Sequence, residues 1–246
     1  DAHEKVVKNI NPYLVEGDDI VVTKRNKPLL NNPSMLLGNM PNDGGFLMLT
    51  NEEKIELIQN EPLSDKYIKQ LLGSVEFINN KLRWCLWLEN LNPIDLKSMP
   101  LVKQRIENVK NTRLESSREA TKKLAEYPTL FGEIRQPKTN YIIIPQVSSE
   151  NREYIPIGYV NKDIIVNNRC SFIESEELFI FGIMTSKMHM IWTSYTCGRM
   201  KSDFNYSIGI VYNNYPFPKN VTEKHKSVVE EKAQNVLDIR ASFNDC

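Results

Sequence analysis

The chain has 246 residues, of which 41% are hydrophobic and 25% are charged, so it is long enough for one large or two small globular domains with a buried core. Its 31 Lys and Arg residues balance 31 Asp and Glu residues. Because the formal net charge is zero, no overall field draws the chain to nucleic acid or anionic membrane, and any such contact must come from a local basic patch.

The cysteines are widely spaced and include no Cys-x-x-Cys pair, so the sequence predicts free thiols in a reducing, cytoplasmic compartment and no zinc cluster. The most apolar stretch, Leu178–Met184, is far shorter than the ~20 residues of a membrane span. We therefore expect a soluble protein without a membrane partner. The chain starts at Asp1 without a methionine, which suggests processing or a piece of a longer protein.

Residues 1–49 mix short apolar runs with turn-forming residues, so they are expected to form strands and loops. Thr50-Asn51-Glu52-Glu53 is a capping box and predicts a helix that runs to about Asn60. A second helix is expected from Ser64 to Gly73. Val75–Ile78 and Leu82–Leu88, joined through Asn79-Asn80, predict a hairpin whose second strand lies in the core.

From Met99 to Glu126 the spacing begins as helical, with Val102, Ile106 and Val109 at i, i+4 and i+7, but Arg113 and Ser116 fall where the apolar stripe should continue. Three strands that form a small antiparallel sheet should follow. A buried helix, another strand, two prolines and a charged terminal helix should follow. The fold class expected is α+β, with mixed helices and small antiparallel sheets. The segments concerned are Tyr141–Val147, Tyr154–Val160, Ile164–Val166, Glu174–Thr196, Ser207–Tyr212 and Thr222–Phe243.

Three features have the composition of functional sites, but a structural role is favoured for each. Asn11-Pro12-Tyr13 resembles the catalytic loop of amino-methyltransferases but lacks its second proline. The Gly38–Gly45 loop could hold a phosphate on backbone N–H groups, although a tight structural turn is favoured. The histidines are His3, His189 and His225, and His189 in an apolar helix is expected to be a hydrogen-bonded core residue.

Residues 101–123 are the best candidate for contacts with DNA phosphates, although a solvated helix face explains the composition equally well. Seven basic residues, namely Lys103, Arg105, Lys110, Arg113, Arg118, Lys122 and Lys123, stand against the acidic Glu107, Glu115 and Glu119. Seven minus three gives a local charge of plus four. The residues expected to contact the DNA backbone here are Lys103, Arg113, Lys122 and Lys123.

A polar segment, Ser148 to Tyr154, separates two apolar strands. If it is extended, Glu150 and Arg152 project from the same face, because side chains alternate along a strand. A carboxylate can accept from cytosine N4 and an arginine can donate to guanine O6 and N7, so this spacing suits base recognition. The alternative, favoured by the residues alone, is an exposed hairpin with a weak ion pair.

The order of motifs resembles the target-recognition region of the MmeI-like type IIL restriction-modification enzymes. The resemblance runs through Ile10–Leu14, Lys27–Leu29, Gly38–Gly45, Arg83–Leu88, Pro145–Glu150, Tyr154–Gly158, Gly198–Asp203 and Tyr212–Pro218. It implies base contacts by Glu150 and Arg152, and more loosely by Tyr154 and Arg118. It also implies that Arg199 and Lys201 lie near the DNA backbone or pack beneath the recognition surface.

The resemblance implies a larger parent enzyme that methylates adenine with S-adenosylmethionine, through an upstream catalytic domain. Residues 1–218 are then the DNA target-recognition domain, 1–49 its junction with the methyltransferase domain, and 219–246 the start of a helical C-terminal region. No catalytic residue, metal or cofactor site is expected in this chain. Two alternatives stay open, an enzyme that acts unaided and a scaffold that mainly docks the methyltransferase domain.

Overall fold

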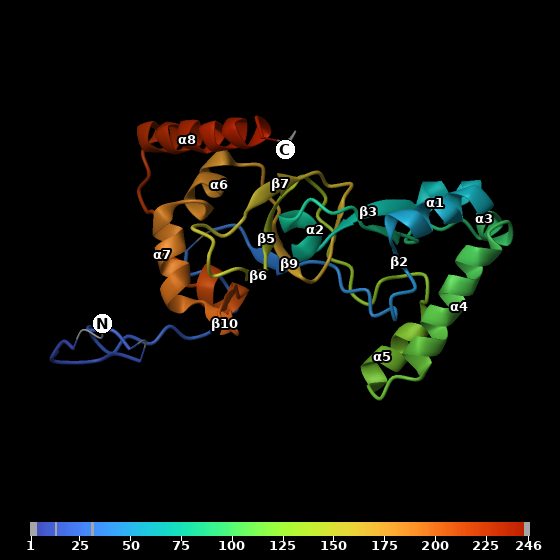
Figure 1. Ribbon diagram of the computed structural model, residues 1–246, viewed down its shortest axis with the longest axis horizontal. Helices are drawn as coiled ribbons and strands as arrows, with labels where there is room; N and C mark the ends of the chain where they lie inside the picture. The colour runs from blue at the N-terminus through green and yellow to red at the C-terminus, as the bar shows by residue number, and fades with distance from the viewer. Residues whose placement is uncertain (1–3, 13, 31, 244–246) are drawn as a thin grey trace.

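The computed structural model describes residues 4–12, 14–30 and 32–243. Two groups of helices lie at opposite ends of an elongated molecule, with a sheet between them (Figure 1). Helices and small, mostly antiparallel sheets are both present, which confirms the α+β class.

The central sheet is antiparallel and has the strand order β1-β9-β5-β7. Its two middle strands are buried along their whole length. Ile142 and Ile144 point into one hydrophobic core, whereas Tyr141 and Ile143 point into another, as alternation along a strand requires. Both faces of the sheet are therefore covered. The strands are β1 (Met35–Leu37), β5 (Tyr141–Pro145), β7 (Gly158–Val160) and β9 (Cys170–Ile173).

We call the two ends of the molecule the first and second lobes. The first lobe contains three helices, α6 (Leu178–Met184), α7 (Lys187–Thr196) and α8 (Glu223–Ala241). At Gly182 in α6, a Cβ atom would lie 2.7 Å from a methyl group of Val229, so glycine allows α6 and α8 to pack closely. The terminal helix was predicted correctly.

Two predictions in this lobe are wrong. The single helix expected over Glu174–Thr196 is two helices, because the side chain of Ser186 accepts from the N–H of His189 and caps a new helix. The strand expected over Ser207–Tyr212 is a π-helical turn, η3 (Ile208–Tyr212), in which Val211 and Tyr212 are buried.

His189 is buried in the core of this lobe, as predicted. Its Nε2 lies 3.0 Å from the Tyr206 hydroxyl, and its ring meets the edge of Tyr215. Burial lowers the pKa of His189 to about 4, because the apolar surroundings disfavour the imidazolium.

We expect His189 to make stability depend on pH. The unfolded chain binds the proton more tightly than the folded one, so this contribution is complete above about pH 6.5 and is lost as the pH falls toward 4. The limiting slope is about 1.4 kcal/mol per pH unit. Urea unfolding between pH 7.5 and 4.5 measures it. His189→Gln should flatten the dependence and His225→Gln should not, whereas equal slopes in both variants would contradict the assignment.

The second lobe contains a mixed sheet of strand order β2-β4-β3-β8, in which only β3 and β8 run parallel. The capping box is present as predicted, since Thr50 and Glu53 each accept from the other's backbone N–H. The elements are β2 (Met48–Leu49), α1 (Asn51–Asn60), β3 (Ile68–Leu72), β4 (Trp84–Leu86), α3 (Pro93–Lys97) and β8 (Ile165–Val166).

Two further predictions fail between residues 62 and 82. The helix expected from Ser64 to Gly73 is a 3₁₀ helix, η1 (Pro62–Tyr67), followed by β3, because strands β4 and β8 bind the backbone of Ile68–Leu72 from both sides. The hairpin expected at 75–88 has a helix, α2 (Ser74–Ile78), in place of its first strand, where Glu76 accepts from the N–H of Gly73. The strand β4 does lie in the core, as predicted.

Beyond α3, an arm of two helices extends from the second lobe (Figure 1). The apolar stripe of α4 (Pro100–Leu114) consists of Val102, Ile106 and Val109, and it ends at the buried Arg113. The helix therefore ends where the apolar stripe breaks in the sequence. It resumes as α5 (Glu119–Lys123) and η2 (Leu124–Glu126).

Cys85, Cys170 and Cys197 are buried free thiols, which agrees with the prediction, and Cys246 lies outside the described residues. Burial raises the pKa of Cys197 to about 11 and that of Cys170 to about 12, so these thiols are poor nucleophiles. In the described part of the chain, no helix has the length and apolar content needed to cross a membrane.

Candidate nucleic-acid interface

A small antiparallel sheet of three strands brings together two segments about fifty residues apart in the sequence. Its strands are β6 (Val147–Ser148), β10 (Gly198–Met200) and β11 (Asp203–Asn205), in the order β10-β11-β6. Ser148 is paired with Phe204, so the residues that follow Ser148 leave the sheet beside the β10–β11 hairpin.

The residues after β6 form an exposed turn, which we call loop 149–154. The N–H of Arg152 donates to the carbonyl oxygen of Ser149 at 3.2 Å, and the N–H of Glu150 donates to Oδ1 of Asp203 at 3.2 Å. The segment is therefore not extended, and strand alternation does not explain how Glu150 and Arg152 are placed. Both residues are nevertheless exposed to solvent.

The far end of loop 149–154 is anchored in the core. Ile155 and Ile157 are 3% and 1% exposed, and Nη1 of Arg240 in α8 donates to the carbonyl oxygen of Ile157 at 2.6 Å. Arg152, Tyr154 and Arg240 line an open pocket of about 500 Å³. The loop is thus held at both ends while its middle faces solvent.

The β10–β11 hairpin places two of the predicted basic residues next to this loop. The guanidinium of Arg199 lies 4.0 Å from the centre of the Phe204 ring and donates to the carbonyl oxygens of Ser194 and Ser202. Lys201 is exposed in the turn with a φ of 57°, an uncommon value for a residue with a side chain. Strand β11 lies next to the loop, the exposed strand β10 forms the outer edge of the hairpin, and Phe204 is buried.

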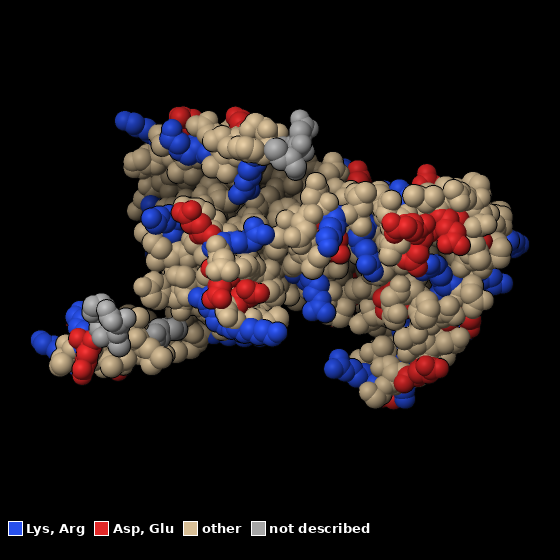
Figure 2. All heavy atoms as spheres, in the orientation of Figure 1, with Lys and Arg blue, Asp and Glu red and all other residues tan. Residues whose placement is uncertain are grey.

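The other predicted basic residues lie on the arm formed by α4 and α5. Arg118 and Lys123 are exposed at its tip, and Lys122 is paired with Glu119 at 2.8 Å. Lys103 is exposed near the start of α4, away from α5. In Figure 2, Lys and Arg side chains gather on the edge over β10 and at the tip of the arm, and the outline of the molecule is recessed between them.

Arg113 was predicted to contact DNA phosphates, and the structure contradicts this. Its side chain is 1% exposed, and its five N–H groups donate to five backbone carbonyl oxygens at 2.7–3.0 Å. Burial lowers the pKa of its guanidinium. The acceptors are Pro41, Asn42, Leu124, Tyr127 and Leu130.

The Gly38–Gly45 loop has a structural role, as the sequence favoured. Two of its carbonyls bind Arg113, and Oδ2 of Asp43 accepts from the N–H of Leu47 at 2.7 Å. Gly44 and Gly45 have φ values of 65° and 89°, which explains the glycines.

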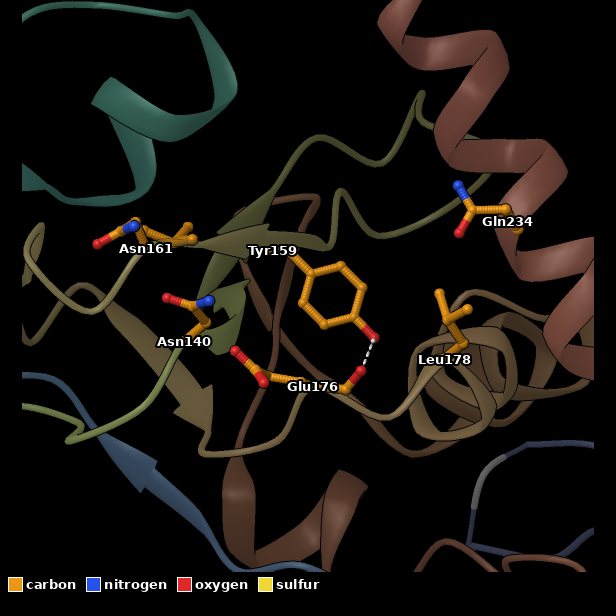
Figure 3. A pocket seen from close by; sticks show the side chains of 7 residues that line it. Asn140, Tyr159, Asn161, Glu176, Leu178 and Gln234 are labelled. Carbon is orange, nitrogen blue, oxygen red and sulfur yellow. Dashed lines mark hydrogen bonds between the residues drawn. The ribbon is translucent and has the colours of Figure 1, made fainter.

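The remaining candidate sites add no residue to this surface. The Asn11-Pro12-Tyr13 motif falls partly outside the described residues, because Tyr13 is not among them. Within residues 4–12, 14–30 and 32–243, no cluster of His, Cys, Asp or Glu is placed to hold a metal ion. A pocket of about 350 Å³ between β7 and α8 is lined by neutral polar and apolar side chains and the carboxylate of Glu176, and does not favour phosphate (Figure 3).

Asp203 was not singled out from the sequence, although it contacts loop 149–154 directly. Gly198–Asp203 is one of the motifs that carry the family resemblance. Nothing local in the sequence shows that Asp203 contacts a loop that comes about fifty residues earlier in the chain. A cross-strand pairing between β6 and β11 is the missing information.

Comparison with known proteins agrees with this arrangement. The family model for the MmeI target recognition domain matches residues 16–219. DNA methyltransferase A of Bacillus subtilis (strain 168) is 42% identical over 240 residues, which are 98% of this chain but 27% of that protein. The solved structure of the type IIL restriction-modification enzyme MmeI in complex with DNA superposes with a TM-score of 0.94 at 43% identity and covers 98% of this chain and 32% of that one.

The chain thus spans about a quarter to a third of the length of these relatives. The family match covers the second lobe, the sheet between the lobes, loop 149–154, the β10–β11 hairpin and helices α6 and α7 of the first lobe, and it ends before α8. The chain belongs to the family of MmeI target recognition domains.

Proposed function

We propose that this chain recognises a short sequence in double-stranded DNA, as the target-recognition part of a restriction-modification methyltransferase. The observation that carries the proposal is the pairing of β6 with β11, which places the exposed Glu150, Arg152 and Tyr154 beside the basic β10–β11 hairpin. A relative of the same family has been solved with DNA, which supports this function.

The two groups of side chains have different roles in this proposal. Glu150 accepts from cytosine N4 and Arg152 donates to guanine O6 and N7, so that loop 149–154 distinguishes base pairs in the major groove. Lys201 and Arg199 on the hairpin, and Arg118, Lys122 and Lys123 on the arm, contact phosphates or base edges across the recess. Phosphate contacts fix the register of the protein on the duplex and carry no sequence information.

We further propose that the remaining part of the parent enzyme transfers the methyl group to adenine N6 from S-adenosylmethionine. The DNA methyltransferase relative, most of whose length lies outside the match, supports this. In this division residues 1–218 recognise DNA, residues 1–49 join them to the catalytic domain, and residues 219–246 begin a helical region.

Salt dependence tests the phosphate contacts. The logarithm of the binding constant should fall linearly with the logarithm of salt concentration, and Lys123→Ala or Lys201→Ala should each reduce the slope by about 0.9, because each removes one phosphate contact. Fluorescence anisotropy with a labelled duplex gives the slope. Lys162→Ala, an exposed lysine in the turn after β7, is the matched control and should leave it unchanged.

The proposal would be wrong if the full-length protein bound all duplexes with equal affinity and no salt dependence. A slope that falls in the Lys162 variant as much as in the other two would show that general charge, not this surface, determines binding.

A second candidate function is a scaffold that docks the methyltransferase domain. An apolar groove of about 380 Å³ between residues 11–22 and α7 favours it, with Met188, Ile191 and Tyr195 exposed along the helix. Substituting Met188 and Tyr195 by serine should then loosen the packing of the catalytic domain, which limited proteolysis detects as faster cleavage between the domains. The choice of bases should not be relaxed. Relaxed base choice in that variant would argue against a purely docking role for the groove.

A further inference from the structure

The start of loop 149–154 depends on a side chain from the neighbouring hairpin. The pairing of β6 with β11 ends at Ser148, and beyond it the two segments are no longer paired as strands. The next contact between them is the hydrogen bond from the N–H of Glu150 to Oδ1 of Asp203. The side chain of Asp203 therefore connects the hairpin to loop 149–154 beyond the end of the strand pairing.

Two further hydrogen bonds complete the backbone of the loop. The N–H of Asn151 donates to the hydroxyl of Ser149 at 3.3 Å, and the N–H of Arg152 donates to its carbonyl oxygen. Three successive N–H groups, from Glu150 to Arg152, thus have acceptors. Since the directions of the Glu150 and Arg152 side chains follow from this backbone, the acceptor provided by Asp203 helps to determine where they point.

A carboxylate is an unfavourable residue at a surface that approaches DNA, because it repels the phosphates. Arg199 and Lys201, on the same hairpin, have the opposite and favourable charge. The contribution of Asp203 must therefore come from its hydrogen bond and not from its charge.

We propose that Asp203 is a positioning residue for base selection, which acts through the backbone of Glu150 and makes no base contact itself. The inference rests on the proposed function, since it assigns a role in the same recognition surface. It separates the charge of the side chain, which opposes binding to any DNA, from its acceptor oxygen, which favours the correct sequence.

Two substitutions at this position distinguish the charge from the hydrogen bond. Asp203→Asn and Asp203→Ala both remove the negative charge, but only asparagine keeps an acceptor oxygen at the same place. Both variants should bind a non-cognate duplex more tightly than the wild type, by a similar factor. Only Asp203→Ala should lower the ratio of cognate to singly substituted affinity, by roughly 2- to 12-fold, the value of one hydrogen bond.

The measurement is anisotropy with the full-length protein, a cognate duplex selected from a random pool and its single-base variants. Asp163→Ala, which removes an exposed carboxylate from the turn between β7 and β8, is the control for charge and should leave the ratio unchanged. Thermal unfolding checks that each variant is folded. If Asp203→Ala does not fold, Asp203→Ser replaces it, since its hydroxyl is one bond shorter and does not reach the loop.

Equal ratios in the Asp203→Asn and Asp203→Ala (or Ser) variants would overturn the inference, since the acceptor would then have no role. Arg152→Ala is measured in parallel to separate this result from a failure of the proposed function. If that variant relaxes selection while the Asp203 variants behave alike, only the positioning role is wrong. If it also leaves selection intact, base reading by loop 149–154 is wrong and the positioning role falls with it.

Discussion

Replacing Arg113 by methionine is expected to destabilise the protein by about 3–5 kcal/mol, although methionine keeps an unbranched apolar stem. The loss follows from the five backbone carbonyls that the guanidinium satisfies. They would stay buried without donors, and each unsatisfied group costs free energy. Urea unfolding should show a lower midpoint with an unchanged slope, which indicates lost stability and not a change in the unfolded state.

Two companion variants test this explanation. Arg118→Met, at an exposed position in the same basic segment, should change stability by less than about 0.5 kcal/mol. Arg113→Lys should recover only part of the loss, because an ammonium group has three donors and cannot reach five carbonyls. Wild-type stability of Arg113→Met would show that these hydrogen bonds are replaced by water and that the segment is not rigid.

Replacing Arg152 by alanine should make the recognised DNA sequence degenerate at one position. Loss of a bidentate contact to guanine O6 and N7 reduces the discrimination between the right and the wrong base by about 1–3 kcal/mol. This corresponds to a factor of roughly 5 to 150 in affinity. Mapping of methylated adenines in DNA from cells that express the full-length protein measures the change, because a relaxed motif appears as additional modified sites.

Glu153→Ala is the matched control, since Glu153 is exposed in the same loop but has no predicted base contact. It should leave the motif unchanged. Lys201→Ala should weaken methylation evenly on all sites, as expected for a phosphate contact. An unchanged motif in the Arg152 variant would place base selection on other residues, and the absence of any methylation by the wild type would contradict the methyltransferase part of the proposal.

The helices that the sequence predicted best are those with local signals. The capping box at Thr50 and the charged segment after Thr222 define α1 and α8 through contacts within a few residues. The errors occur where distant partners decide the structure. Ile68–Leu72 is a strand because β4 and β8 bind it, and residue spacing alone does not distinguish a short buried strand from a helix.

The same distinction applies to the candidate site. The types of the residues at 150 and 152 and the family resemblance suggested base recognition, but neither shows that the turn carrying them is hydrogen-bonded to Asp203. Arg113 has the composition of a phosphate contact, and only the folded chain shows that carbonyls from two separate segments surround it. A positive charge in a sequence does not reveal whether its acceptors are inside or outside the molecule.

Loop 149–154 is held by backbone hydrogen bonds and by the buried residues that follow it, whereas Glu150 and Arg152 extend into solvent. If these two side chains contact bases as proposed, exchanging them changes the chemistry offered to DNA at little cost in folding free energy. Substitutions at these positions are therefore expected to alter base choice without loss of stability. In this proposal, the side chains that choose the DNA sequence can change while the fold that carries them stays the same.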